Sequence, residues 1–353
     1  MNAQFTSYLT RIEKEIAIAL PSQSSKDWAM ISFGKESGCI NDSHWNALVE
    51  PTKNLIDLGG KRWRPLLLVL CAESICPQKM DRAYHLTPLV EFVHTASLIH
   101  DDIEDSSDMR RGKPAAYITY GMDTAINAAS WLYFEAAACI DTLDADTTTK
   151  EKLYASYARE LRRLHLGQAM DITWHKNADF CPSVDEYIAM VKNKTGTLAS
   201  LSAKTGTLIA GADNAVVERA GNIAAEIGAG FQIIDDVINL TSGNPGKKRG
   251  DDIVEGKKSL PVLMFMQKYG TDSKEAKILR QCFTDAHNDG IDSPAVERAI
   301  GILSESNVIK KSREQGITFI DDGCSLFKEL FGNGNNGADK ISSLFSSMIP
   351  AIL

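Results

Sequence analysis

The chain has 353 residues, of which 44% are hydrophobic and 24% charged, and its formal net charge is −8. This balance is typical of a globular protein whose core is large enough to fold without a disulfide or a structural metal ion. The acidic excess argues against nucleic acid as a main partner, because binding nucleic acid requires a basic surface.

Cysteine usage and hydropathy bear on the compartment. The seven cysteines are scattered, odd in number and contain no CxxC pair, so we expect reduced thiols in a reducing compartment, the cytoplasm. No segment reaches ~18 apolar residues without charge, and we expect no membrane span. The first 20 residues carry acids inside their apolar stretch, which predicts an amphipathic helix and not a signal peptide.

Helical periodicity dominates the rest of the chain. After the first helix, residues 21–48 are polar and irregular and predict a loose connection. Apolar residues then recur at threes and fours, with no convincing run of alternating strands. The clearest helical segments are 89–102, 125–140, 152–172, 185–212 and 217–240. We predict one all-α domain over residues 1–353, a bundle of roughly ten helices around a central cavity, with residues 1–45 as a candidate N-terminal extension.

An acidic cluster follows the first of these segments, in LIHDDIEDSSDMRRG at 98–112. On a helix Asp101 and Asp105 share one face, whereas Asp102 is displaced by ~100°. Like charges at this spacing repel unless a cation lies between them, and carboxylate oxygens suit a hard ion such as Mg²⁺. A solvated helix end is the alternative, but the preceding LVEFVHTASLIH is too apolar for a surface helix.

A second acidic pair occurs in FQIIDDVINL, where Asp235 and Asp236 follow an apolar turn and Asn239 lies four residues beyond Asp235. Unpaired carboxylates inside an apolar helix are costly to bury. Two such helices that face each other across a bundle would form a cage of oxygen ligands.

Basic residues accompany both acidic segments. Each alone is consistent with an ordinary surface charge, but together they suggest two polyanion sites, one held through metal and one held by Arg and Lys directly. The pentapeptide KTGTL occurs at 194 and again at 204, and the ten-residue offset turns the two lysines to different directions, so we expect only one to reach a shared site. The basic residues are Lys61, Arg62, Arg64, Arg110, Arg111, Lys194, Lys247 and Lys257.

Six motifs follow one another along the chain: GGKRWRP, ExxHxxSLxHDDxxD with RRG, GQxxD, KTG, FQxxDD, and GKxxGxD with GKKSLP. In this order they resemble the motifs of the trans-isoprenyl diphosphate synthases. The resemblance covers about residues 50–265. It implies an all-α homodimer that uses Mg²⁺, three ions per active site, to condense isopentenyl diphosphate with dimethylallyl, geranyl or farnesyl diphosphate and release pyrophosphate.

The resemblance also implies roles for individual residues. The metal residues are Asp101, Asp105 and Asp235, supported by Asp102 and Asp236. The allylic diphosphate is contacted by Arg110, Lys194, Lys247 and Lys257, with Thr195 and Gln232 steadying the reacting centre. Isopentenyl diphosphate is held by Lys61, Arg64, His94 and Arg111. Asn239 departs from the family, which more often has Asp there.

The resemblance also implies that product length depends on one face of the first acidic helix. Ala96 and Ser97 stand where bulky aromatic side chains stop elongation early in the family, and both are small here. The resemblance therefore implies a geranylgeranyl or longer all-trans product. The stretch WLYF at 131–134 could form a deeper floor, although ordinary aromatic core is the more common reading of such a segment.

Three other functions are compatible with parts of this pattern. A class I terpene cyclase also uses an aspartate-rich helix, but it handles one diphosphate and needs no second cationic set. A His-Asp phosphohydrolase is suggested by His100-Asp101 but needs further histidine ligands in matching motifs. A regulatory subunit of a heteromeric synthase should have lost acids from one motif, and both pairs remain.

Overall fold

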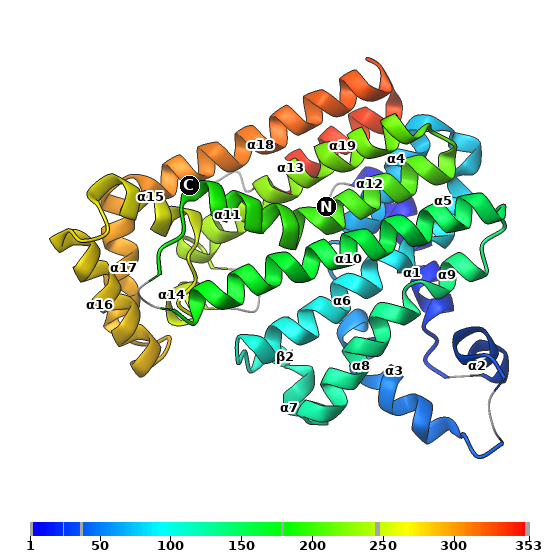
Figure 1. The fold of residues 1–353 in the computed structure, drawn as a ribbon, viewed down its shortest axis with the longest axis horizontal. Coiled ribbons are helices and arrows are strands. Elements are labelled where there is room, and N and C mark those ends of the chain that lie inside the picture. Colours follow the sequence, from blue (N-terminus) through cyan, green and yellow to red (C-terminus); the bar gives the residue numbers. More distant parts are fainter. Residues whose placement is uncertain (1–2, 24, 36–37, 178–179, 244–247, 350–353) are drawn as a thin grey trace. The chain divides into compact units, whose positions relative to one another are not determined.

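The computed structural model describes residues 3–23, 25–35, 38–177, 180–243 and 248–349. This part of the chain is almost entirely helical, and its only strands are two of two residues each (Figure 1). The predicted all-α class is confirmed. No helix in the described ranges is both long and apolar enough to cross a bilayer.

The chain divides into two compact units. Unit 1 comprises residues 1–160, 200–222 and 327–348, and unit 2 comprises 161–199, 223–326 and 349–353. Helices α10 (Thr147–His175), α12 (Thr197–Ala210), α13 (Asn214–Leu240) and α18 (Val308–Phe331) contribute residues to each. The single domain and its central cavity stay predictions.

In unit 1 the buried helix α6 packs against α8, α4 and α1. A small apolar cluster of Leu55, Ile99, Ala125 and Ala129 lies between α3, α6 and α8. The elements of this unit are η1 (Ala3–Phe5), α1 (Thr6–Ala19), α2 (Lys26–Phe33), α3 (Asp42–Asp57), α4 (Trp63–Ile75), η2 (Pro77–Lys79), α5 (Met80–His85), α6 (Thr87–Glu104), β1 (Met109–Arg110), β2 (Lys113–Pro114), α7 (Ala116–Tyr120), α8 (Met122–Glu135), α9 (Ala138–Asp141) and α19 (Asn336–Ser346).

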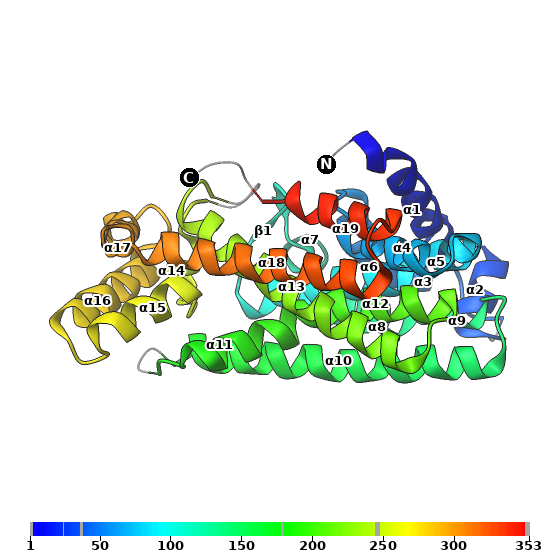
Figure 2. The ribbon, with the colours of Figure 1, turned by 90° about the horizontal axis from the view of Figure 1, so that it is seen from above.

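In unit 2 the helices α15, α16 and α17 pack side by side (Figures 1 and 2). Their apolar faces form a core that includes Phe265, Leu279 and Leu303, and a second cluster surrounds Trp174 and Tyr187. The elements of this unit are α11 (Val184–Val191), the π-helical segment η3 (Lys192–Gly196), α14 (Asp251–Val254), α15 (Leu260–Tyr269), α16 (Lys274–Asp289) and α17 (Pro294–Glu305).

The expected loose connection over 21–48 is wrong, because α2 and the start of α3 lie within it. Local capping explains both helices. The Ser25 hydroxyl accepts a hydrogen bond from the Trp28 amide, and Asn41 and His44 form a reciprocal capping box at the start of α3. Such caps satisfy amides that a helix start leaves without partners. The polar residues that suggested a loop are therefore the caps of two helices.

Candidate active site

The aspartate-rich segment is the C-terminal end of α6. Along this largely buried helix, His94, Ser97, Asp101 and Asp105 form one half-exposed stripe. Asp105 ends the helix, and its amide donates a 2.9 Å hydrogen bond to the carbonyl oxygen of Asp101. Asp101 and Asp105 therefore share an accessible face, whereas Asp102 is 1% exposed and lies within the protein.

A tight hairpin follows and separates the two adjacent arginines. Arg111 and Gly112 both have positive φ, 51° and 75°, as a type I′ turn between β1 and β2 requires. The Arg110 guanidinium folds back onto the buried carboxylate of Asp102, with Nε 2.8 Å from Oδ1. The Arg111 Nη1 instead donates to the carbonyl oxygens of Leu55, at 3.1 Å, and Gly59. The hairpin thus fixes one arginine on the acidic helix and the other on the turn before α4.

The Gly59-Gly60 turn accommodates Arg111. Gly59 has a φ of 77°, which favours glycine, and a Cβ on Gly60 would lie only 3.1 Å from the Arg111 Nη2. Lys61, which follows the turn, is exposed. The turn therefore brings Lys61 and Arg111 to one region of unit 1.

Arg64 and His94 lie beside this turn. Nη1 of Arg64 is 3.4 Å from Nε2 of His94, and its guanidinium lies 4.4 Å from the Trp63 ring centre. Burial, followed by the charges of Arg64 and Arg111, holds the pKa of His94 well below its usual value. His94 is therefore neutral at physiological pH and leaves the arginine charges available to an anion.

Arg62, in contrast, belongs to the interior. Its guanidinium donates to Glu91 Oε1 at 2.6 Å, to Glu13 Oε1 at 2.8 Å and to the carbonyl oxygen of Ile56 at 2.7 Å. These bonds join α1, α6 and the end of α3. Unlike Lys61 and Arg64, Arg62 of GGKRWRP is thus a buried structural cation.

In unit 2 the second acidic pair repeats the pattern of the first. Asp235 is half-buried, whereas Asp236 is buried. Oδ2 of Asp236 accepts a 2.6 Å hydrogen bond from the Tyr187 hydroxyl, and Oδ1 accepts one of 3.0 Å from Nε2 of Gln232. Burial raises the pKa of Asp236 to about 6 despite these two donors. In each pair one carboxylate is accessible and its neighbour is tied to the protein.

The first KTG motif forms the π-helical segment η3, where an α-helix is locally widened. A Cβ on Gly167 would lie 2.3 Å from the Lys194 amide nitrogen, so this glycine lets two backbones touch. Nζ of Lys194 lies 2.7 Å from Oδ2 of Asp171, and the Thr195 hydroxyl donates to Oε1 of Gln232 at 2.8 Å. Thr195, Gln232 and Asp236 are therefore connected by hydrogen bonds.

Sequence reasoning missed Asp171 and Tyr187 as members of this arrangement. Asp171 is the last residue of GQxxD, a motif that carried the resemblance without an assigned role, so a signal was present. Tyr187 lies in no motif and only its buried contact with Asp236 reveals it. Both residues fix polar groups that the sequence did predict.

Asn239 holds the start of α14. This side chain is buried, and its Oδ1 accepts a 3.4 Å hydrogen bond from the Asp252 amide. Nζ of Lys257 lies 2.5 Å from Oε2 of Glu255 and 3.8 Å from Oδ1 of Asp252. Lys247, also predicted to bind substrate, lies outside the described residues. Asn239 thus contributes to the position of the segment that carries Lys257.

The second KTG copy packs inside unit 1. Lys204 is buried, and its Nζ lies 3.0 Å from Glu160 Oε1 and 2.7 Å from Glu218 Oε2. A buried lysine requires such partners. These contacts make the second copy a packing element of unit 1.

The two product-length positions lie on α6. Ala96 is buried, and the half-exposed Ser97 donates its hydroxyl hydrogen to the His94 carbonyl oxygen at 2.8 Å. In WLYF, the Tyr133 ring stacks on His100 with centroids 5.6 Å apart, whereas Trp131 stacks on Phe33 at 6.2 Å. Phe134 is 80% exposed. The aromatic residues of WLYF therefore lie in different surroundings.

The acidic side chains fit Mg²⁺ better than an ion that needs a complete protein cage. Within the described ranges, no group of three or more His, Cys, Asp and Glu side chains could hold a metal ion. Mg²⁺ is usually bound by one or two carboxylates, with water and substrate phosphate completing its shell. Asp101 and Asp105 in unit 1, and Asp235 in unit 2, are carboxylates suited to this role.

Comparison with known proteins agrees with these features. The polyprenyl synthetase family model matches residues 46–299. A geranylgeranyl diphosphate synthase of Sulfolobus acidocaldarius is 30% identical over 302 residues, 84% of this chain and 85% of that protein. A geranylgeranyl pyrophosphate synthase of Macrophomina phaseolina is 30% identical over 88% of this chain and 91% of its own length.

A solved structure extends the likeness to the fold. The geranylgeranyl pyrophosphate synthetase from Pyrococcus horikoshii superimposes with a TM-score of 0.82 at 25% identity, covering 99% of this chain and 98% of that one. The match of the family model over most of the chain, together with these relatives, decides the assignment. The chain belongs to the polyprenyl synthetase family, the trans-isoprenyl diphosphate synthases.

Proposed function

We propose that this prenyltransferase condenses isopentenyl diphosphate with an allylic diphosphate, namely dimethylallyl, geranyl or farnesyl diphosphate. The product is a geranylgeranyl or longer all-trans polyprenyl diphosphate, and pyrophosphate is released. Family membership supports the prenyl-chain elongation, and two relatives carry the name geranylgeranyl synthase.

The arrangement of basic residues in unit 1 favours a two-substrate enzyme over a terpene cyclase. In unit 1 the Arg64–His94 pair and Arg111 adjoin the turn that bears Lys61, whereas Arg110 is tied to Asp102. The first group would form a cationic site whose printed contacts involve none of the aspartates. A terpene cyclase binds one diphosphate and has no use for this second site. Isopentenyl diphosphate is the substrate that the cationic group would hold.

The accessible carboxylates would bind the metal-bound diphosphate of the allylic substrate. We assign Mg²⁺ contacts to Asp101, Asp105 and Asp235. Mg²⁺, proposed at three ions per site, would neutralise charge on the departing pyrophosphate. Asp102 and Asp236 would act indirectly, because one holds Arg110 and the other is held by Tyr187 and Gln232.

The remaining polar residues would position the diphosphate and the reacting carbon. Lys194, oriented by Asp171, would bind the allylic diphosphate together with Arg110, Lys257 and Lys247. Thr195 and Gln232 would place oxygen atoms near the cationic allylic carbon.

The carbon–oxygen bond of the allylic diphosphate breaks, the double bond of isopentenyl diphosphate attacks the resulting cation, and the lost proton passes to pyrophosphate. The protein orients both substrates and excludes the water that would quench the cation.

The proposal also covers the oligomeric state and the cellular location of the protein. We propose a homodimer, supported by the exposed apolar side chains of Ile118, Met122 and Ile126 on α7 and α8 of unit 1. A cytoplasmic location is supported by the cysteines, all seven of which are free thiols.

Product sizing tests the activity. The purified chain is incubated with Mg²⁺, isopentenyl diphosphate and each allylic starter in turn, and the products are separated by length. We expect a diphosphate of geranylgeranyl length or longer, and loss of turnover when a chelator removes Mg²⁺. Pyrophosphate release without isopentenyl diphosphate would instead indicate a cyclase, and no turnover with any starter would indicate a regulatory subunit.

A further inference from the structure

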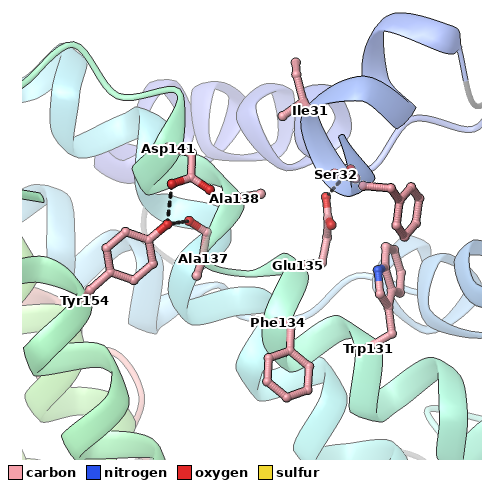
Figure 3. Close-up of a pocket in the computed structure, with 10 residues that line it drawn as sticks. Ile31, Ser32, Trp131, Phe134, Glu135, Ala137, Ala138, Asp141 and Tyr154 are labelled. Atoms are coloured by element: carbon pink, nitrogen blue, oxygen red, sulfur yellow. Dashed lines mark hydrogen bonds between the residues drawn. The ribbon is translucent and has the colours of Figure 1, made fainter. Parts of the chain in front are cut away.

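A pocket in unit 1 takes no part in the proposed reaction. It has a volume of about 310 Å³ and lies between α2, the C-terminal end of α8, α9 and the N-terminal part of α10 (Figure 3). This volume is at the lower end of the range found for small-molecule sites. The pocket is lined by Ile31, Ser32, Phe33, Trp131, Phe134, Glu135, Ala137, Ala138, Asp141 and Tyr154.

A buried carboxylate is the main polar group of this pocket. Glu135 is 6% exposed, points towards Ser32, and accepts a 2.7 Å hydrogen bond from its hydroxyl (Figure 3). No lysine, arginine or histidine is among the described residues that line the pocket. A buried carboxylate that is hydrogen-bonded by one neutral hydroxyl stays costly to ionise. Accordingly, burial raises the pKa of Glu135 to about 7.

A second acidic group lies in the same pocket. Oδ1 of Asp141 accepts a 2.5 Å hydrogen bond from the Tyr154 hydroxyl (Figure 3). The ammonium group of Lys150 bonds to the Asp141 backbone oxygen at 2.8 Å, and not to a carboxylate of the pocket. Two carboxylates and no lining cation make this pocket unsuited to a diphosphate or any other anion.

Aromatic rings form much of the remaining wall. Phe33 and Trp131 stack with centroids 6.2 Å apart, and the exposed ring of Phe134 lies at the rim. Such rings attract organic cations through their faces and cover an apolar body. A bare hard metal ion requires several oxygen ligands, and no group of three metal-binding side chains occurs in the described residues.

We propose that this pocket binds a small organic ammonium ion, with the ammonium group on Glu135 and the apolar part against Trp131 and Phe33. The ion would compensate the buried carboxylate, and its N–H groups would supply the charged donors that the lining residues lack. None of the lining residues is among those assigned to metal or diphosphate binding, and the proposal does not rest on the prenyl-transfer activity.

Calorimetric titration of the full chain with 2-phenylethylammonium tests the proposal. We expect saturable binding with a Kd on the order of 1 mM at about pH 8, weaker at about pH 6 because Glu135 gains a proton. The neutral analogue 2-phenylethanol should bind at least about tenfold more weakly. Equal binding of the alcohol would overturn the proposal.

Variants separate this pocket from the prenyl-transfer site, where an ammonium ion could also bind. Glu135→Gln should weaken binding at least about tenfold, whereas the control Glu305→Gln, at an exposed position on α17, should not change it. Ser32→Ala keeps the carboxylate and should retain binding, and circular dichroism of Glu135→Gln checks that its fold is intact. Binding that survives Glu135→Gln, or disappears in Ser32→Ala with the fold intact, would refute the assignment.

Discussion

The Tyr187 hydroxyl lies 2.6 Å from Oδ2 of Asp236 and donates its hydrogen to this buried carboxylate. The contact joins α11 to α13 and holds Asp236 beside the accessible Asp235. Gln232 supplies a second donor at 3.0 Å and also accepts from Thr195. The second acidic motif is therefore fixed from two helices.

Removal of this hydroxyl should lower both stability and activity. In Tyr187→Phe the Asp236 carboxylate loses a donor inside the protein, and we expect the free energy of unfolding to fall by about 1–3 kcal/mol. Denaturant titration measures this loss, and product formation measures the effect on turnover. Tyr269→Phe, at a partly exposed position, is the matched control. Unchanged stability and turnover in Tyr187→Phe would show that Gln232 alone suffices.

Asp171 should act by orienting Lys194. In Asp171→Asn the 2.7 Å ion pair is lost, and we expect kcat to fall about 10- to 100-fold because the lysine ammonium is displaced from the diphosphate. Steady-state kinetics at saturating isopentenyl diphosphate measures this change. Asp171→Glu should recover part of the activity, and Asp185→Asn, on the exposed first turn of α11, should leave it unchanged. Full activity in Asp171→Asn would contradict the orienting role.

Product length should depend on Ala96 and Ser97, which precede the aspartates on α6. Replacing Ala96 and Ser97 with phenylalanine places two rings one turn from Asp101, and we expect shorter products because the growing chain meets them early. Chromatography of the products against length standards measures the shift. Ser97→Ala removes only a hydroxyl and should keep the original length. Identical products from the phenylalanine variant would exclude this face as the path of the chain.

Arg62 should matter for stability more than for substrate affinity. Arg62→Ala leaves Glu91 buried without its cation, and we expect a loss of about 3–5 kcal/mol in the free energy of unfolding. Urea denaturation followed by circular dichroism measures it. Arg82→Ala breaks an exposed pair with Asp144 and should cost less than about 1 kcal/mol. Similar losses in both variants would contradict the structural role of Arg62.

Glu135 should make stability fall as pH rises. Its pKa is about 7 in the folded protein and 4.5 for the ordinary side chain, so between these values the folded state binds more protons than the unfolded state. Below about pH 4.5 both states are protonated and the cost of ionising the buried carboxylate is absent; it grows as pH rises and is complete above about pH 7, where it amounts to about 3 kcal/mol. Denaturant titrations at several pH values in this range give the free energy of unfolding. Its decrease with rising pH should be steeper for the wild type than for Glu135→Gln. Parallel curves would show that Glu135 titrates normally.

The sequence alone determined the features that depend on local order. Helical periodicity gave the all-α class, and the four-residue spacing placed Asp101 and Asp105 on one face with Asp102 displaced by ~100°, because the helix repeat is set by backbone geometry. The order of the motifs gave the family, which the comparisons confirm. The helices α2 and α3 were missed because the same polar residues serve as caps and as loop residues.

Only the tertiary structure decided where the charged side chains go. Arg110 and Arg111 are neighbours in the chain, yet the hairpin sends one to Asp102 and the other to the Gly59 turn. Asp171 meets Lys194, and Tyr187 meets Asp236, only because separate helices pack together. Long side chains reach partners that are distant in sequence, and the energy of burying a charge selects those partners only after the backbone has folded.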